Sequence, residues 1–255
     1  MSLYFASLAS GSNGNCYYIG NSHEAVLIDA GISCRETEKR MARLGLSIQL
    51  VRAIFISHEH TDHTNGARML SNKHNIPVYI SEPTNRNRSL NLDEKLKMPL
   101  LANWPVEVGG LKVKAFPKMH DACDPLSFTV SGGGSTVGVF TDIGSICENV
   151  AHNFSQCHAA FLETNYDEEM LEQSRYPAFL KKRIKSDHGH LSNLQSLELL
   201  NSHRSPFLTH LLFSHLSQDN NDPQKVLALF SKHANGIQLE IASRQHETKL
   251  YQIGM

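Results

Sequence analysis

Short apolar runs separated by glycine and polar residues fill the first thirty positions of the chain. The runs are LYFASLAS, CYYIG and AVLIDAG, and the glycine-bearing stretch GSNGN separates the first two. Apolar runs of this length, bounded by turn residues, are typical of buried β-strands. We therefore expect successive strands over residues 3–10, 16–20 and 25–31.

Helical and strand patterns follow further along the chain. Ser33 and Glu36 form a capping-box pattern, which predicts a helix that ends at Gly45. Glycines 132–134 separate two apolar runs and predict a hairpin over residues 126–142. Residues 84–105 show no interpretable pattern. We expect further strands over residues 51–57, 76–81, 111–116, 158–163 and 207–215, and further helices through Ala67 and Leu70, after Ser192, and from the Asp222-Pro223 pair.

The order of these elements and the size of the chain together bound the fold. Strands that cluster early and then alternate with helices predict an α/β layered architecture, with sheets covered by helices. The chain has 255 residues, of which 40% are hydrophobic, and this is enough for a single domain spanning residues 1–255. The formal net charge of -1 gives no overall attraction to nucleic acid, so any site for a polyanion has to be local.

Neither the first residues nor the cysteines indicate export. The start, MSLYFASLASGSNG, has no basic segment followed by a sustained apolar core, so it does not form a signal-peptide pattern. No run approaches the roughly 18 apolar residues of a transmembrane helix. The five cysteines are odd in number and form no C-x-x-C pair, which favours reduced thiols in a cytoplasmic protein that does not contact membranes.

Histidines and acids gather directly after the strand expected over residues 51–57. In IFISHEHTDHTNG, His58 and His60 alternate in extended backbone and therefore project to the same side. Asp62 and His63 follow and can turn toward a second ion. Imidazole and carboxylate without thiolate suit zinc, manganese or iron better than calcium or magnesium. A chance cluster in a solvated loop is the alternative, but polar groups this close to a core are costly unless an ion satisfies them.

The pattern H-x-H-x-D-H at a strand end resembles the metallo-β-lactamase superfamily. The stretches AVLIDAG, KMHDACDP, VGVFTDIG and LLFSHLSQDN extend the resemblance over nearly the whole chain. It implies an α/β fold, a four-layer αββα sandwich of two mixed β-sheets flanked by helices. It also implies two divalent ions, zinc or manganese, with Asp142 between them and Asp29 supporting the ligand loop. By the same resemblance, His58, His60 and His120 hold one ion, and Asp62, His63 and His215 hold the other.

Some neighbouring residues compete with these ligands. His210 is the competitor of His215, but it lies within the expected strand rather than at its end. Cys123 follows His120 closely and is an alternative ligand. Two further acids in the same stretch are candidates for supporting or loop-capping groups, namely Asp121 and Asp124.

A dinuclear centre of this kind indicates the reaction but not the substrate. Two ions bridged by a carboxylate and a water generate a hydroxide nucleophile at neutral pH and bind the oxygens of the electrophile. Esters, thioesters, lactams and phosphodiesters are all open to such an attack. The motif therefore predicts hydrolysis, and other residues have to indicate what is hydrolysed.

The stretches FLETN and SDHGHLSN resemble the phosphodiesterase branch of the superfamily, which includes tRNA 3′-processing enzymes and other nucleases. This resemblance implies that His190 and Glu163 assist the departure of a poor alkoxide leaving group, with Ser192 near the phosphate. His188 is a weaker candidate for the same task. The alternative is that His190 merely begins the helix capped by Ser192.

A basic run, RYPAFLKKRIK, lies just before this histidine. Arg175, Lys182 and Arg183 are candidates for contacts along a phosphate backbone. Tyr176 and Phe179 interleave with them, and stacking on bases competes with ordinary packing as their role. A solvated helix face would give the same pattern. The SGSNGN loop is a candidate for offering backbone N–H groups to a phosphate, with a plain turn as the alternative.

Taken together, the motifs resemble one subgroup of the superfamily, the YycJ/WalJ proteins. The matching stretches include LASGSNGN, SHEHTDH, HDACDP, RYPAFLKKRI and HLSQDNN. The resemblance implies a bacterial cytoplasmic DNA exonuclease that acts from 5′ ends and needs no β-CASP insertion. The spacing between Asp142 and His215 leaves no room for that insertion, and no tRNA-gripping arm is evident, which argues against tRNA as the substrate. The alternatives are a hydrolase of small esters, thioesters or lactones, similar to glyoxalase II, and a non-catalytic nucleic-acid-binding module.

Overall fold

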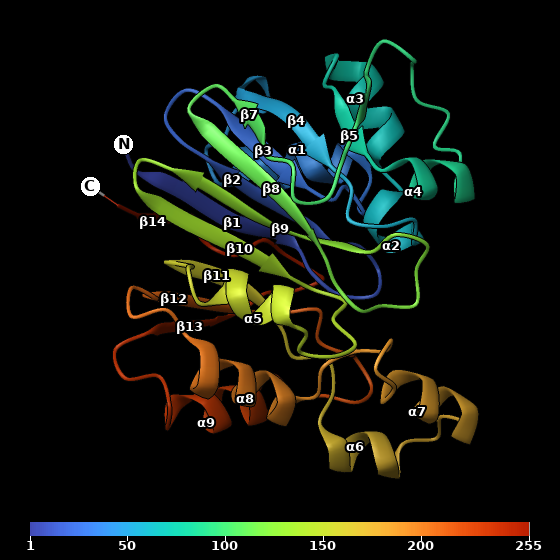
Figure 1. The fold of residues 1–255 in the computed structure, drawn as a ribbon, viewed down its shortest axis with the longest axis vertical. Helices are drawn as coiled ribbons and strands as arrows, with labels where there is room; N and C mark the ends of the chain where they lie inside the picture. The colour runs from blue at the N-terminus through green and yellow to red at the C-terminus, as the bar shows by residue number, and fades with distance from the viewer. Residues whose placement is uncertain (255) are drawn as a thin grey trace.

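Two seven-stranded β-sheets lie face to face in the computed structural model, which describes residues 1–254 (Figure 1). The first sheet has the order β14-β1-β2-β3-β4-β5-β6 and the second has the order β13-β12-β11-β10-β9-β8-β7. The strands of the first sheet are β14 (Tyr251–Ile253), β1 (Leu3–Ala9), β2 (Cys16–Gly20), β3 (Ala25–Ile28), β4 (Val51–Phe55), β5 (Val78–Ile80) and β6 (Lys97–Pro99). Those of the second are β13 (Gln238–Ile241), β12 (His210–Ser214), β11 (Ala159–Glu163), β10 (Ser135–Phe140), β9 (Leu126–Gly132), β8 (Leu111–Pro117) and β7 (Val106–Val108).

Helices cover the outer face of each sheet. On the first sheet these are α1 (Cys34–Arg43) and α3 (Ala67–His74), and on the second they are α5 (Glu148–Phe154), α8 (Asn193–His203) and α9 (Pro223–Ser231). The remaining helices lie in the connections: α2 (Thr61–Thr64), α4 (Glu82–Asn87), α6 (Glu168–Gln173), α7 (Ala178–Ile184) and a short 3₁₀ turn at Ile48–Leu50. The four-layer αββα fold expected from the resemblance is therefore confirmed.

Three apolar clusters fill the three spaces between the layers. Along β2, Tyr17 belongs to the cluster between the sheets, whereas Tyr18 belongs to the cluster beneath α1 and α3. Successive side chains of a strand point to opposite faces, and here both faces are covered. This explains why β2 and β3 are apolar along their whole length, whereas β8 and β9 alternate apolar with polar residues.

The mixed topology brings many strand ends to one edge. Strands β3 to β6 are parallel, and so are β10 to β13. β8 runs in the same direction as β10, because both are antiparallel to β9. The loops that follow β3, β4, β8, β10, β11 and β12 therefore lie at one end of the sandwich, between α2 and α7 on the right of Figure 1.

Most of the expected elements are present, with shorter bounds. The Ser33 side chain accepts a hydrogen bond from the Glu36 backbone, and Gly45 follows α1 with φ +71°. The Glu36 side chain, however, pairs with Arg40 instead of completing the capping box. The strand expected over residues 207–215 begins only at His210. Residues 84–105 hold most of α4 and the edge strand β6.

None of the helices in residues 1–254 has the length and apolar character needed to cross a membrane.

Candidate metal centre

Backbone hydrogen bonds clamp the loop after β4 against the neighbouring strand ends. Asn15 N–H donates to Asp62 O at 2.7 Å, and Ala30 N–H donates to His63 O at 2.9 Å. The chains come so close that a Cβ atom on Gly31 would lie 1.6 Å from Asp62 O. Glycine is therefore required at position 31, and the loop carrying the histidines is held rigidly.

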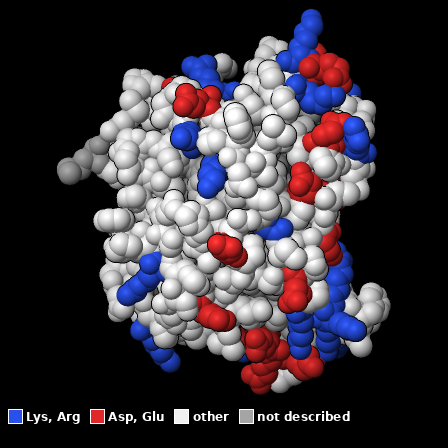
Figure 2. Space-filling view, in the orientation of Figure 1, with Lys and Arg blue, Asp and Glu red and all other residues white. Residues whose placement is uncertain are grey.

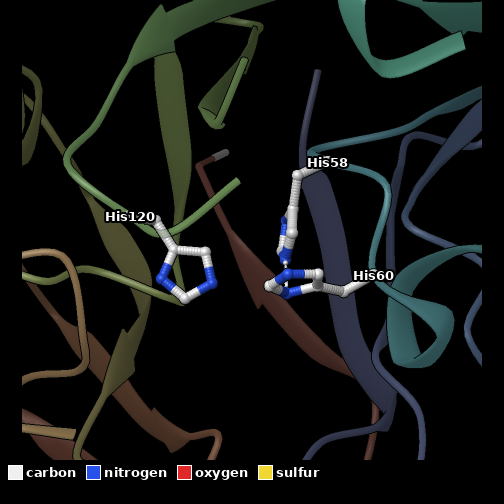
Figure 3. Close-up of side chains that lie close together, drawn as sticks. All are labelled: His58, His60 and His120. Atoms are coloured by element: carbon white, nitrogen blue, oxygen red, sulfur yellow. Dashed lines mark hydrogen bonds between the residues drawn. The ribbon is translucent and has the colours of Figure 1, made fainter. Parts of the chain in front are cut away.

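Three histidines from two loops form the first group of candidate ligands (Figure 3). His58 Nε2 and His60 Nδ1 are 3.0 Å apart, and His120 faces them from the loop after β8. His120 Nδ1 is hydrogen-bonded to Gly189 O at 3.1 Å, while its Nε2 is buried without a hydrogen-bond partner among the described residues. Donor atoms of all three histidines lie within 4.8 Å of one another.

A second group lies beside the first, with Asp142 between them. Asp62, His63 and His215 bring donor atoms within 4.8 Å of one another. Asp142 Oδ2 lies 3.1 Å from His63 Nε2, and Asp142 Oδ1 lies 3.1 Å from His215 Nδ1 and 3.8 Å from His120 Nε2. The structure thus brings together all seven residues that the sequence indicated as ligands.

Asp29, Asp142 and His215 have left-handed backbone conformations, with φ of 61°, 54° and 56°. Each follows closely on the end of a strand. This conformation is uncommon outside glycine, although Asp, Asn and His adopt it more readily than other residues. It turns the three side chains out of the strand direction and toward the shared centre. Residues held in this way cluster at functional sites.

The fully buried carboxylate of Asp29 forms hydrogen bonds with the loop that carries the candidate ligands. Asp29 Oδ1 accepts the Ser57 backbone N–H at 2.8 Å, and its Oδ2 accepts the Ser57 hydroxyl at 2.9 Å. Oδ2 also lies 2.7 Å from His63 Nδ1, which donates to it. The bond fixes the ring so that its other nitrogen, Nε2, faces Asp142. Such partners orient a ligand and raise its basicity.

We expect Asp29→Asn to weaken metal binding by about 10–100-fold, because the amide has one acceptor oxygen in place of two, cannot accept all three hydrogen bonds, and leaves the His63 ring free to turn. Asparagine tolerates the left-handed backbone at this position. Metal competition with a chelating dye measures the change, and far-UV circular dichroism checks the fold. Asp187→Asn, an exposed acid, is the matched control. An unchanged affinity in Asp29→Asn would contradict a supporting role.

The charges of the cluster fit divalent cations. Burial would lower the pKa values of His63 and His215, but the carboxylates around them, led by Asp142, raise both, that of His215 to about 10. Asp142 Oδ2 and His215 Nε2, like His120 Nε2, are buried without a hydrogen-bond partner among the described residues. Buried polar atoms are normally paired. Open nitrogen and oxygen donors beside an excess of carboxylate are what zinc or manganese would satisfy.

An imidazole–carboxylate pair stands at the rim of the centre. Glu163, at the end of β11, is fully buried, and its Oε1 lies 2.8 Å from His190 Nδ1 and 3.0 Å from His215 Nδ1. Its Oε2 accepts the Ile143 N–H at 2.7 Å. Burial alone would raise the pKa of Glu163, but the two histidines lower it to about 2. The His190 side chain is 22% exposed, so its second nitrogen remains accessible.

Of the three basic residues expected to contact the substrate, only Arg183 lines the recesses beside the centre. Arg183 Nε pairs with Asp121 Oδ2 at 2.5 Å and lies beside the centre. Lys182 is exposed on α7 but lines a different hollow, and Arg175 is exposed before α7. Figure 2 shows the Lys and Arg side chains over α7 at the lower right, above the acidic side chains of α6.

Two expected phosphate contacts need correction. Ser192 is fully buried: its hydroxyl accepts the Gln195 N–H and donates to Glu168, so it caps α8 instead of facing a phosphate. In the SGSNGN loop, Gly11 N–H donates to Asn15 Oδ1 and Gly14 N–H donates to Gly11 O. Both glycine N–H groups are used within the loop, which favours the plain turn.

Sequence reasoning missed three polar residues that contact the candidate ligands or lie directly beside them. Ser57 joins Asp29 to the rings of the ligand loop, and Asn15 Nδ2 lies 3.1 Å from both Asp62 Oδ2 and His63 Nε2. Lys118 is buried, and its Nζ donates to Thr141 O at 2.6 Å, directly before Asp142. Of these three residues, only Lys118 had a signal in the sequence, namely its position two residues before the candidate ligand His120.

Comparisons with known proteins find relatives over most of the chain. A family model described as a β-lactamase superfamily domain matches residues 24–215. Exodeoxyribonuclease YycJ of Bacillus anthracis is 34% identical over 224 residues, covering 87% of this chain and 85% of that protein. Exodeoxyribonuclease WalJ of Streptococcus pneumoniae is 29% identical over 222 residues, covering 85% of this chain and 82% of that protein.

Solved structures share the fold at low sequence identity. The metallo-β-lactamase fold protein YhfI of Bacillus subtilis aligns with a TM-score of 0.75 at 14% identity, over 99% of both chains. The Zn(2+)-bound PqqB of Methylobacterium extorquens aligns with a TM-score of 0.75 at 12% identity, over 99% of this chain and 100% of that one.

Proposed function

The chain belongs to the metallo-β-lactamase superfamily and is a metal-dependent hydrolase, and we propose that it is a DNA exonuclease that removes nucleotides from 5′ ends. The ligands are proposed to be His58, His60 and His120 for one ion, and Asp62, His63 and His215 for the other, with Asp142 shared. Two divalent ions in this position would lower the pKa of a water and neutralise charge on the phosphate oxygens.

The pair formed by His190 and Glu163 is the observation that favours a phosphodiester as the substrate. The thiolate of a thioester departs without help, whereas the alkoxide of a phosphodiester needs a proton. Because Glu163 Oε1 engages His190 Nδ1, the His190 Nε2 atom is the one available to the substrate. The similarity to two proteins named exodeoxyribonuclease supports DNA as the polymer.

In this proposal each residue has a defined task. Water attacks phosphorus in line with the departing 3′ oxygen, and the Asp62 carboxylate, 20% exposed, accepts the proton that the water loses. The P–O3′ bond breaks while His190 Nε2 gives its proton to O3′, which leaves a 3′ hydroxyl on one product and a 5′ phosphate on the other. Glu163 is a positioning residue, since it is buried and reaches the substrate only through His190.

Digestion of end-labelled DNA tests this function. Protein loaded with zinc or manganese is incubated with 5′-phosphorylated duplex DNA, single-stranded DNA and RNA, labelled at either end. We expect a 5′ label to be released at once as a mononucleotide and a 3′-labelled strand to shorten progressively. Turnover of a thioester or lactone without cleavage of any DNA would assign the chain to the small-molecule hydrolases instead.

A further inference from the structure

A recess with partly apolar walls adjoins His190. It is lined by Tyr176, which precedes α7, and by Leu180 and Ile184, which lie one turn apart on the same side of that helix. All three side chains are only half-buried. We call this space the Tyr176 recess.

The apolar residues of the Tyr176 recess have no part in the core. None of Tyr176, Leu180 and Ile184 belongs to the three apolar clusters formed by the described residues. Tyr176 is nonetheless held in place, because its hydroxyl donates to Asp219 Oδ2 at 2.9 Å. Apolar side chains arranged around a concave space beside polar groups are typical of a ligand site.

A second recess, with no apolar side chain in its lining, shares Arg183 with the Tyr176 recess. It is lined by His60, Thr61, Asp62 and Asn65, all polar, and Arg183 lines both spaces. The two recesses therefore meet at the guanidinium group of Arg183, beside the candidate metal centre. The polar lining of the second recess suits the sugar–phosphate backbone of DNA. The apolar part of the Tyr176 recess offers a surface on which a planar base can stack.

We propose that the Tyr176 recess binds the terminal nucleoside of the DNA, with its base stacked on Tyr176 and packed against Leu180 and Ile184. The proposal rests on the nuclease function and goes further by assigning the position of one nucleotide. His190 lines this recess and gives its proton to the departing 3′ oxygen, so the nucleoside that carries that oxygen lies on the His190 side. In digestion from a 5′ end, that nucleoside is the terminal one.

A comparison of two substrates with two variants tests this assignment. The substrates are 5′-phosphorylated single strands that differ only at the first position, which carries either a normal base or an abasic tetrahydrofuran. Stacking of a base on an aromatic ring is worth about 1–3 kcal/mol, so we expect Tyr176→Ala to lower kcat/KM about 5–150-fold for the normal end. For the abasic end we expect little change, and Tyr176→Phe should retain most activity on both.

Trp104→Ala is the matched control, because Trp104 is an aromatic residue that is 72% exposed and does not line the recess. It should leave both rates unchanged. An equal loss on both substrates in Tyr176→Ala, or the same pattern in Trp104→Ala, would overturn the assignment while leaving the nuclease function intact. Failure of the unaltered protein to cut either strand would instead overturn the nuclease function, and the assignment with it.

Discussion

Replacing Asp142 with asparagine should reduce nuclease activity at least about a thousandfold and lower the number of bound metal ions. Asp142 lies between the two groups of candidate ligands, with one oxygen 3.1 Å from His63 Nε2 and the other 3.1 Å from His215 Nδ1. Loss of a merely supporting group costs about 10–100-fold in metal affinity or activity. Asp142 is proposed to be a charged ligand shared by both ions, so its loss should lower metal affinity and activity by more than this.

The choice of asparagine and of a control variant distinguishes a loss of metal binding from misfolding. Asparagine preserves the size of the side chain and tolerates the φ of 54° at this position. Asp124→Asn is the control, because Asp124 lies in the loop after β8 that also carries His120 and has no hydrogen bond or ion pair among the described residues. Metal content is measured by elemental analysis of purified protein, beside the rate of DNA digestion. Full metal content together with full activity in Asp142→Asn would refute the shared-ligand role.

The ligand loop could be predicted because its information is local. Four candidate donors lie within six residues, directly after an apolar strand, so the sequence alone shows a polar cluster that needs an ion. His120, Asp142 and His215 depended on the resemblance, because they are far apart in the chain and meet only when the strand ends converge. The left-handed conformations that aim Asp142 and His215 leave no trace in composition or periodicity.

The prediction that Ser192 contacts a phosphate was wrong because a serine at the start of a helix has two possible roles. A serine before an apolar helical stretch serves equally well as a helix cap or as a donor to a ligand, and the sequence G-H-x-S does not distinguish the two. In the structure the Ser192 hydroxyl accepts the Gln195 backbone N–H at the start of α8, and the Gln195 side chain accepts the Ser192 N–H to complete the capping box. The prediction of a helix after Ser192 was therefore correct, and the contact with phosphate was not.

The outer strands of both sheets were missed because each is short and packs less completely. β6, β7 and β14 have three residues each, and β6 is partly exposed at the edge of its sheet. Such strands are specified by pairing with a neighbour far away in sequence, as β14 pairs with β1. The inner strands carry either a continuous apolar run, as in β3, or an alternating apolar pattern, as in β8, and for that reason the pattern of the sequence alone predicted them.

Replacing His190 with alanine should lower kcat for DNA by about 10²–10⁴-fold, the usual contribution of a positioned general acid. Its Nδ1 is fixed by Glu163 at 2.8 Å, and its ring centre lies 5.3 Å from that of His120 and 5.2 Å from that of His215. In the proposed mechanism the other nitrogen protonates the oxygen that leaves the phosphorus. Metal content should stay the same, because His190 is outside the proposed ligand set.

A substrate that needs no proton separates a proton donor from a structural residue. In bis(p-nitrophenyl) phosphate the leaving group departs as a stable phenolate, so His190→Ala should lose far less activity on this diester than on DNA. His188→Ala is the matched control, since His188 is exposed in the same loop and has no hydrogen bond or ion pair among the described residues. An equal loss on both substrates would show that His190 only maintains the shape of the site. A loss confined to DNA would identify it as the group that releases the 3′ oxygen.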